Sequence, residues 1–322
     1  MYKGKARAHT NIALIKYWGK ADEKIILPKN NSLSLTLDAF YTETSVCFDE
    51  SFTADCFTLD GVLQDAKATQ KVSKFLDLFR QKANCDYFAK VESVNHVPTA
   101  AGLASSASGL CALAGACNQA LGLGLSQIEL SKMARKGSGS ACRSVYGGFV
   151  EWEKGYDDDS SYAVPVDSAG FEEELAMIFI VVNQKQKKVS SRDGMKSTVE
   201  TSSFYPVWLQ EAPKDLQAMK QAIHAKDFTK LGQITEANAL KMHACTLAAV
   251  PPFTYWNAVR NLRESGLECY FTMDAGPNVK VLYQKKDEAS IFAELSKQFR
   301  DEQLIIAHAG VGIEYLEMEV SK

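Results

Sequence analysis

The sequence lacks a long apolar segment, a basic excess and any paired-cysteine motif. No run of eighteen apolar residues occurs among the 322 residues, so no membrane-spanning helix is expected. The N-terminus shows no apolar segment of the kind found in signal peptides. The net charge of −3 argues against a nucleic-acid-binding protein, because such proteins usually carry an excess of Lys and Arg. We therefore expect neither a membrane nor a nucleic acid as a partner.

The cysteines and histidines show no metal-binding pattern either. The eight cysteines are scattered without a CxxC pair, and the five histidines lack the spacing of metal ligands. Cys111 and Cys117 lie in an Ala-rich helical stretch, which is typical of reduced, buried thiols. Reduced cysteines indicate a cytoplasmic enzyme.

What the chain does contain is enough apolar sequence for two packed domains, since 46% of its residues are hydrophobic. Strands mix with pairs of helices and show no regular βαβ alternation, which favours an α+β fold. We place the domain boundary near residue 178, giving domains 1–178 and 179–322. Expected strands are 4–18, 33–49, 87–95, 145–152, 161–166, 176–183, 267–273, 279–284, 303–308 and 312–320. Expected helices are 68–82, one that ends near Leu121, one that starts at Ser126, and 287–299. The region from the loop after strand 176–183 to about Arg263 is expected to be mainly helical.

The strongest chemical signal is the loop from Pro98 to Gly109, PTAAGLASSASG, which runs into a helix. Small residues let backbone N–H groups approach an anion, and the start of a helix favours phosphate. Serine hydroxyls can donate to phosphate oxygens or bind a metal ion. The alternative is a plain Ser-rich loop that allows tight helix packing. No GxxxxGK[ST] motif occurs, and the two GxG pairs lack the third glycine of a dinucleotide site.

Two further segments gather groups that bind anions. NIALIKYWGK places Lys16 and Lys20 at the end of an apolar strand, although solvated lysines at a strand end are an equal alternative. GSGSACRS offers flexible glycines, serine donors and Arg143, whose planar fork suits a carboxylate or phosphate. The alternative there is a turn with one surface Arg.

Asp274 lies in FTMDAGPN, after an apolar strand and before a turn. A lone Asp at such a position usually only starts the turn. Among cations such as Lys16 and Arg143, however, its carboxylate would stay ionised with a lowered pKa.

These segments together resemble a known family. The Pro-x-x-x-Gly-Leu-x-Ser-Ser-Ala loop is similar to the phosphate loop of the GHMP kinase superfamily. Its form here, together with four other segments, resembles the diphosphomevalonate decarboxylases, and the match covers nearly the whole chain. The other four segments are 11–20 (NIALIKYWGK), 137–144 (GSGSACRS), 242–243 (MH) and 273–278 (MDAGPN).

The resemblance implies a two-domain GHMP-kinase-like fold with ATP and Mg²⁺ as cofactors, in a cytoplasmic homodimer. The N-terminal domain would be ribosomal-protein-S5-domain-2-like, and the C-terminal domain a ferredoxin-like α/β sandwich. The implied reaction phosphorylates 5-diphosphomevalonate at its 3-hydroxyl, after which phosphate and CO₂ leave to give isopentenyl diphosphate. One alternative is a kinase of the same superfamily that stops at phosphorylation, such as a mevalonate 3-kinase. Another is a nucleotide-binding module without catalysis.

The resemblance also implies roles for individual residues. Asp274 would orient or deprotonate the 3-hydroxyl, with Arg143 and Lys16 as the other catalytic residues. The implied substrate contacts are Tyr17, Trp18, Gly19, Lys20, Ser138, Gly139, Ser140, Ala141, Cys142, Arg143 and Ser191. The implied ATP contacts are Lys71, Ala101, Gly102, Leu103, Ala104, Ser105, Ser106, Ala107, Ser108 and Lys187, with Ser106 also as the Mg²⁺ ligand. The chain is shorter than these relatives between Trp256 and Asn257, which leaves the geometry of the following helix open.

Overall fold

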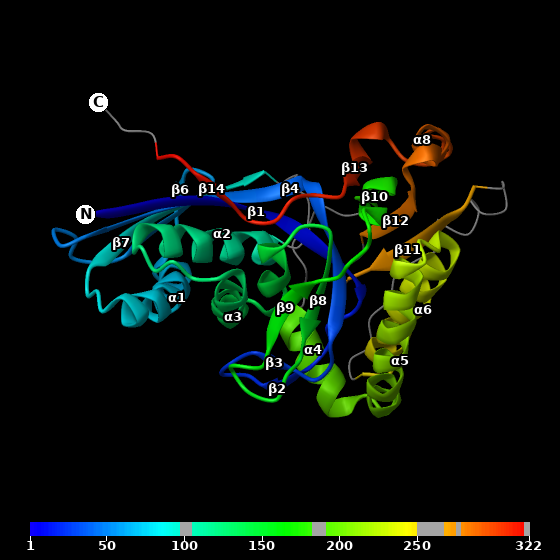
Figure 1. Ribbon diagram of the computed structural model, residues 1–322, viewed down its shortest axis with the longest axis horizontal. Helices are drawn as coiled ribbons and strands as arrows, with labels where there is room; N and C mark the ends of the chain where they lie inside the picture. The colour runs from blue at the N-terminus through cyan, green and yellow to red at the C-terminus, as the bar shows by residue number, and fades with distance from the viewer. Residues whose placement is uncertain (97–104, 182–190, 250–266, 275–277, 319–322) are drawn as a thin grey trace.

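The computed structural model describes residues 1–96, 105–181, 191–249, 267–274 and 278–318 (Figure 1). Two sheets dominate it: an eight-stranded sheet on the left of Figure 1 and a four-stranded antiparallel sheet on the right. Helices pack on both, so the predicted α+β class is confirmed. Within these ranges no helix is both long and apolar enough to cross a membrane.

The N-terminal sheet is built on two long strands, β1 and β4, which pair antiparallel along most of their length. Its order is β14-β1-β4-β7-β5-β6, with β8 paired to β4 and β9 to β8. Because β14 pairs with β1, the end of the described chain returns to the N-terminal domain. A short hairpin, β2–β3, follows β1. The strands are β1 (Tyr2–Ile15), β2 (Lys20–Asp22), β3 (Leu27–Pro28), β4 (Ser32–Asp49), β5 (Cys56–Leu59), β6 (Val62–Leu63), β7 (Phe88–His96), β8 (Phe149–Glu153), β9 (Tyr162–Pro165) and β14 (Glu314–Leu316).

Three helices and a 3-10 turn cover one face of this sheet. They are α1 (Ala66–Ala83), α2 (Ser105–Ala120), α3 (Gln127–Gly137) and η1 (Gly139–Val145). The small residues of α2 let it lie very close to β1, so close that a Cβ on Gly4 would collide with the Ala116 carbonyl. This packing places the start of α2 over β1 and β4, where Ser108 contacts Thr10 and Thr42.

The C-terminal domain encloses its sheet between helices. The sheet order is β11-β12-β10-β13, with α5 and α6 on one face and α8 on the other. The elements are η2 (Phe171–Glu174), β10 (Leu175–Ile180), α4 (Ser191–Thr201), α5 (Tyr205–His224), α6 (Phe228–Leu247), β11 (Cys269–Met273), β12 (Val279–Gln284), η3 (Lys285–Asp287), α8 (Glu288–Ser296), η4 (Asp301–Gln303) and β13 (Leu304–His308).

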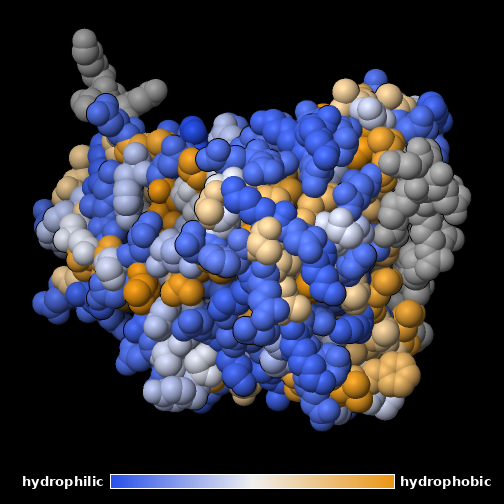
Figure 2. All heavy atoms as spheres, turned by 45° about the vertical axis from the view of Figure 1, so that its right-hand side comes forward, coloured by the Kyte–Doolittle hydropathy of each residue, from blue (hydrophilic) through white to orange (hydrophobic). Residues whose placement is uncertain are grey.

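One apolar cluster joins the two domains. Ile12 and Leu35 of the N-terminal sheet pack in the same cluster as Phe179 of β10, Leu282 of β12 and Leu231 of α6. The end of β1 therefore lies against the C-terminal domain. On the outside, the face in Figure 2 is mostly hydrophilic, with hydrophobic side chains in small groups.

Several expected elements differ in detail. The predicted strand 145–152 begins only at Phe149, because η1 runs to Val145 and Gly148 adopts a φ of +64°. The hairpin β2–β3 and the strands β5 and β6 were missed. The expected turn at 275–278, the helical stretch beyond residue 249 and the short 256–257 connection fall largely outside the described residues. The proposed division at residue 178 falls within β10, and it remains a prediction.

Candidate active site

Asp274 lies between two buried lysines at the junction of the domains. Its Oδ1 is 2.9 Å from Lys16 Nζ, and its Oδ2 is 3.0 Å from Lys280 Nζ. Lys16 follows β1, Asp274 follows β11, and Lys280 lies on β12. The lysine side chains are 2% and 3% exposed, whereas that of Asp274 is 31% exposed. The carboxylate is thus the accessible member of the cluster.

Lys16 is fixed by its backbone as well as by Asp274. Its N–H donates to Asn238 Oδ1 of α6 at 2.8 Å, and its carbonyl accepts from Asn30 Nδ2 at 2.8 Å. Asn238 in turn donates to Asp215, which also pairs with Lys241. A chain of polar contacts therefore holds the end of β1 on the C-terminal helices.

Arg143 is buried without a carboxylate partner among the residues that the structure describes. Its Nε donates to Asn11 Oδ1 at 3.1 Å and to Ser34 Oγ at 3.0 Å, and its Nη1 donates to Ser32 Oγ at 2.6 Å. Neutral groups thus orient the guanidinium and leave its charge unbalanced. Such a group is ready to bind an anion.

The GSGSACRS segment packs tightly against the end of β1. A Cβ on Gly139 would lie 2.6 Å from the Trp152 ring and 3.0 Å from the ring of Tyr17, so only glycine fits there. Asn11 Nδ2 donates to the Ser140 carbonyl at 2.9 Å, and Ser138 Oγ lies 3.4 Å from Ser140 Oγ. Ala141 and Cys142 are buried, and burial raises the pKa of the Cys142 thiol to about 12, which makes it unreactive.

The rest of the YWGK segment has mixed surroundings. Trp18 is 4% exposed and packs among Tyr205, Trp208 and Met242, so its indole is part of the core. Gly19 has a φ of +101°, and the Tyr205 hydroxyl donates to the Trp18 carbonyl at 2.7 Å. Lys20 forms an ion pair with Glu23 in the β2–β3 hairpin. Lys16, directly before this segment, is the residue of NIALIKYWGK whose side chain contacts Asp274.

The electrostatics of the cluster follow from burial and opposite charge. Burial alone would raise the pKa of Asp274, but Lys16 and Lys280 outweigh it and hold this pKa well below its usual range. Burial lowers the pKa of Lys16, and Lys280 and Arg143 lower it further, against the attraction of Asp274. Burial also lowers the pKa of Arg143, whose guanidinium stays charged nonetheless. Three cations around one carboxylate leave the site positive.

The start of α2 holds part of the expected ATP-binding loop. Ser106 is exposed in the first turn of α2, whereas Ala107 is buried. Ser108 is also buried, with Oγ 2.8 Å from Thr42 Oγ1 and 3.4 Å from Thr10 Oγ1, so its hydroxyl faces the sheet. Lys71 is exposed on α1. Ala101, Gly102, Leu103, Ala104 and Lys187 lie outside the described residues, as do the side chains of Ser105 and Ser191.

These residues fit a nucleotide and a Mg²⁺ ion. Helix starts attract phosphate, and the exposed Ser106 hydroxyl is an oxygen donor of the kind that Mg²⁺ accepts. In the described ranges no group of three or more His, Cys, Asp or Glu side chains could hold a metal.

Three residues of the cluster were not predicted. Lys280 had one signal, a lysine inside the apolar strand VKVLY. Asn11 reads as an ordinary strand residue. His243, whose buried Nε2 has no hydrogen-bond partner among the described residues, lies on α6, and burial and Lys16 lower its pKa to about 4. The structure brings them together from distant parts of the chain.

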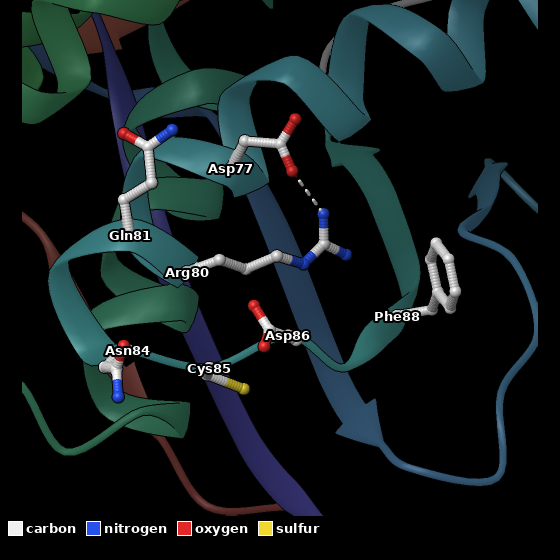
Figure 3. Close-up of a pocket in the computed structure, with 7 residues that line it drawn as sticks. All are labelled: Asp77, Arg80, Gln81, Asn84, Cys85, Asp86 and Phe88. Atoms are coloured by element: carbon white, nitrogen blue, oxygen red, sulfur yellow. Dashed lines mark hydrogen bonds and ion pairs between the residues drawn. The ribbon is translucent and has the colours of Figure 1, made fainter.

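A surface pocket at the end of α1 does not compete with this site (Figure 3). Arg80 points across it, but this guanidinium pairs with Asp77 at 2.8 Å and with Asp55, and donates to the Tyr87 carbonyl. Since two carboxylates neutralise Arg80, the pocket has no free cation to bind an anion.

Family models match both halves of the chain. Residues 8–163 match a diphosphomevalonate decarboxylase-like N-terminal domain, and residues 177–315 match a mevalonate 5-diphosphate decarboxylase C-terminal domain. The diphosphomevalonate decarboxylase of Candida albicans is 36% identical over 93% of this chain and 89% of its own length. The human enzyme is 35% identical over 88% of this chain and 77% of its own.

Solved structures agree with these relatives. Mevalonate diphosphate decarboxylase from Enterococcus faecalis is 60% identical, with a TM-score of 0.94 over 98% of this chain and 99% of that one. The Staphylococcus aureus enzyme is 54% identical, with a TM-score of 0.95 over 98% of both chains. A further structure, at 61% identity, a TM-score of 0.94 and the same coverage as the E. faecalis enzyme, is a complex with MVAPP, AMPPCP and magnesium.

Proposed function

The chain belongs to the diphosphomevalonate decarboxylase family, and we propose that Lys16, Arg143 and Asp274 carry its reaction. That reaction is the ATP-dependent decarboxylation of 5-diphosphomevalonate to isopentenyl diphosphate, a step of the mevalonate pathway to isoprenoids. ADP, phosphate and CO₂ are the other products. ATP and Mg²⁺ are required.

The observation that carries the residue assignment is the excess of buried positive charge at the domain junction. Lys16 and Lys280 contact the carboxylate of Asp274, and Arg143 lies close enough to feel its charge, in a chain whose net charge is −3. Buried cations attract anions strongly, because little water screens them. A substrate with both a diphosphate and a carboxylate supplies the missing negative charge.

Arg143 binds the C1 carboxylate of the substrate in this proposal. Three neutral oxygens hold its Nε and Nη1, and within the described part of the chain Nη2 is left to bind a carboxylate. A held carboxylate stays aligned with the bond that breaks when CO₂ leaves. The neighbouring residues Ser138 to Cys142, Tyr17, Gly19, Lys20 and Ser191 complete the substrate site.

Asp274 orients the 3-hydroxyl toward the transferred phosphoryl group. Both of its oxygens are in ion pairs, so it is a weak base that first accepts a hydrogen bond from the hydroxyl and takes its proton only when the new O–P bond makes that proton acidic. After phosphate departs, its negative charge also favours the positive centre that develops at C3. Lys16 holds the carboxylate and adds positive charge near the moving phosphoryl group.

The start of α2, with the loop before it, binds the ATP phosphates. The proposed contacts are Ala101 to Ser108, Lys71 and Lys187, with Ser106 as the Mg²⁺ ligand. When bound, Mg²⁺ neutralises charge on the phosphate oxygens. The hydroxyl of Ser108 instead supports the helix, since it faces Thr42 and Thr10.

Turnover with ATP, Mg²⁺ and 5-diphosphomevalonate tests the reaction directly. ADP is followed by a coupled assay and CO₂ from substrate labelled at C1, and we expect equal amounts of both. ADP without CO₂ would reject decarboxylation in favour of a kinase that stops at phosphorylation. Absence of both would leave a nucleotide-binding module.

We further propose a cytoplasmic homodimer with domains 1–178 and 179–322. The eight cysteines are all free, which suits a reducing compartment. The homodimer is an expectation from the family resemblance. Light scattering of the purified protein tests it, because a dimer has twice the mass of the chain.

A further inference from the structure

Lys280 is a buried cation that the proposed reaction has not yet used. Its Nζ lies 3.0 Å from Asp274 Oδ2, 3.4 Å from the Asn278 carbonyl oxygen and 5.9 Å from the centre of the Phe179 ring. Lys16 binds the other oxygen of the same carboxylate. The two lysines thus anchor Asp274 from opposite domains, one oxygen each.

Packing alone gives no reason for a lysine at this position. Lys280 lies opposite Phe179 of β10 and Thr272 of β11, in a strand whose other buried residues include Val281 and Leu282. Burying an ammonium group costs several kcal/mol unless a partner offsets it. An apolar residue would fill the strand face without that cost. The Asn278 carbonyl and the Phe179 ring offset part of this cost, but among the described residues Asp274 supplies the one opposite charge in contact with Lys280, so this ion pair is the feature to explain.

A carboxylate held through one oxygen can still turn about its side-chain bonds. A second anchor on the other oxygen removes this freedom, and reactions of bound groups depend on such alignment. We propose that Lys280 is a positioning residue, which fixes the carboxylate plane of Asp274 so that it meets the 3-hydroxyl of the substrate in one orientation. This inference rests on the proposed role of Asp274.

Among the residues that the structure describes, the charged or titratable groups that face Asp274 bear on the test. They are Lys16 after β1, Lys280 on β12, Arg143 on η1 and His243 on α6. The low pKa of His243, about 4, keeps its ring neutral near pH 7. Removing Lys280 leaves Lys16 and Arg143 as the cations, so the carboxylate stays ionised at pH 7 but loses its second anchor. The expected defect is therefore one of alignment.

A double-mutant cycle separates positioning from a general structural role. Lys280→Met should lower kcat by about 10- to 100-fold, as expected for a misaligned group, with the KM for ATP within about twofold. In an Asp274→Asn background the same change should lower kcat by less than about twofold, because its effect passes through Asp274. Single-turnover measurements with excess enzyme make the slow variants measurable.

Matched variants complete the design. Lys285→Met removes an exposed lysine of η3, directly after β12, and should leave kcat unchanged. Lys280→Arg keeps the charge and the donor and should retain more activity than Lys280→Met. Thermal unfolding of each variant shows whether it is folded. If Lys280→Met does not fold, Lys280→Gln replaces it in the cycle.

Two outcomes overturn the inference: a kcat of Lys280→Met within twofold of wild type, or equal losses with and without Asp274. Neither outcome contradicts the proposed function, which is tested separately by ADP and CO₂ release from the wild-type enzyme. If Asp274→Asn itself keeps wild-type kcat, the role of Asp274 fails, and the positioning role of Lys280 fails with it.

Discussion

At the scale of the residue, the site depends on one carboxylate that cations from both domains share. Lys16 comes from the N-terminal domain, whereas Asp274 and Lys280 come from the C-terminal domain. The ion pairs keep Asp274 charged and in place, and its partial exposure lets a substrate reach it. Changing this one side chain should therefore affect both catalysis and stability.

Replacing Asp274 by Asn keeps the shape and removes the charge. We expect kcat to fall by about 10²–10⁴-fold with a near-normal KM for ATP, since the hydroxyl loses its acceptor while the α2 site is intact. Stability should fall by about 2 kcal/mol, because two buried ammonium groups lose their carboxylate and only partial solvent access softens the loss. Steady-state kinetics and urea unfolding measure both.

The same variant has a pH signature. The folded-state pKa of Asp274 is depressed, so its stabilisation is complete above the unfolded pKa, about 4, and is lost as the pH falls toward the folded value. The stability gap between wild type and Asp274→Asn should thus narrow below about pH 4. Asp159→Asn, at an exposed residue, is the control. If kcat of Asp274→Asn stays within tenfold of wild type, the catalytic role of Asp274 is rejected.

Gly19 offers a second test at this scale. It has a φ of +101°, and a Cβ there would lie 1.9 Å from the Tyr205 hydroxyl. Gly61, with a φ of +76° and open space, is the matched control. We expect Gly61→Ala to cost about 1–2 kcal/mol from backbone strain alone. Gly19→Ala should cost about 1–3 kcal/mol more from the collision. Equal losses in urea unfolding would show that Tyr205 yields freely.

The sequence pointed to Lys16, Arg143 and Asp274 because each lies in a distinctive motif. The placement of Lys16 beside Asp274 agrees with the expected lowering of the Asp274 pKa. Lys280 lies in no such motif, and His243 lies in the short 242–243 segment, to which no role could be assigned; tertiary packing brings both near the carboxylate. The indole of Trp18 could not be assigned from sequence either, since a tryptophan beside a site and one in the core look alike.

At the scale of the element, α3 carries the Arg143 segment into the site. It begins with the predicted capping box, in which Glu129 N–H donates to Ser126 Oγ and Ser126 N–H donates to Glu129 Oε2. It ends at Gly137, and η1 then turns Arg143 toward β1. The cap lies at the far end of α3 from the site, so stability and catalysis can be separated here.

Ser126→Ala should lower stability by about 1 kcal/mol, because the N–H of Glu129 loses its side-chain acceptor. We expect kcat to change by less than twofold. Ser126→Asp supplies another good cap and should restore most of the stability in the same unfolding experiment. If both variants lose stability equally, the cap is not the source of the effect.

Long periodic elements were predicted well, whereas short ones were not. The helix expected at 68–82 is α1, and the strand expected at 33–49 is β4, since each has a clear apolar period. The two- and three-residue strands β2, β3 and β6 are too short to show a period. They exist because neighbouring strands offer them partners, which only the folded chain provides.

At the scale of the whole molecule, the two domains share structure that the site needs. One apolar cluster spans both sheets, and the β1 end is tied to α6 through Asn238. Lys220 of α5 adds an ion pair to Glu151 of β8 at 2.7 Å. Since Lys16 and Asp274 lie on opposite sides of this junction, its rigidity bears on catalysis as well as on stability.

Lys220→Met tests this coupling. Glu151, only 5% exposed, would keep the Asn31 amide, at 2.9 Å, as its one side-chain partner in the described ranges. Leaving a buried carboxylate so poorly paired should lower the free energy of unfolding by about 1–3 kcal/mol.

The control is Lys214→Met, which removes an exposed lysine of the same helix, paired with Glu211. It should lower the free energy of unfolding by less than about 0.5 kcal/mol. We also expect kcat/KM to fall severalfold for Lys220→Met alone, because Lys16 and Asp274 would be held less firmly in register. Urea unfolding measures the loss of stability, and steady-state kinetics the loss of kcat/KM, for both variants. Equal effects of the two changes would mean that the shared apolar cluster alone fixes the domains.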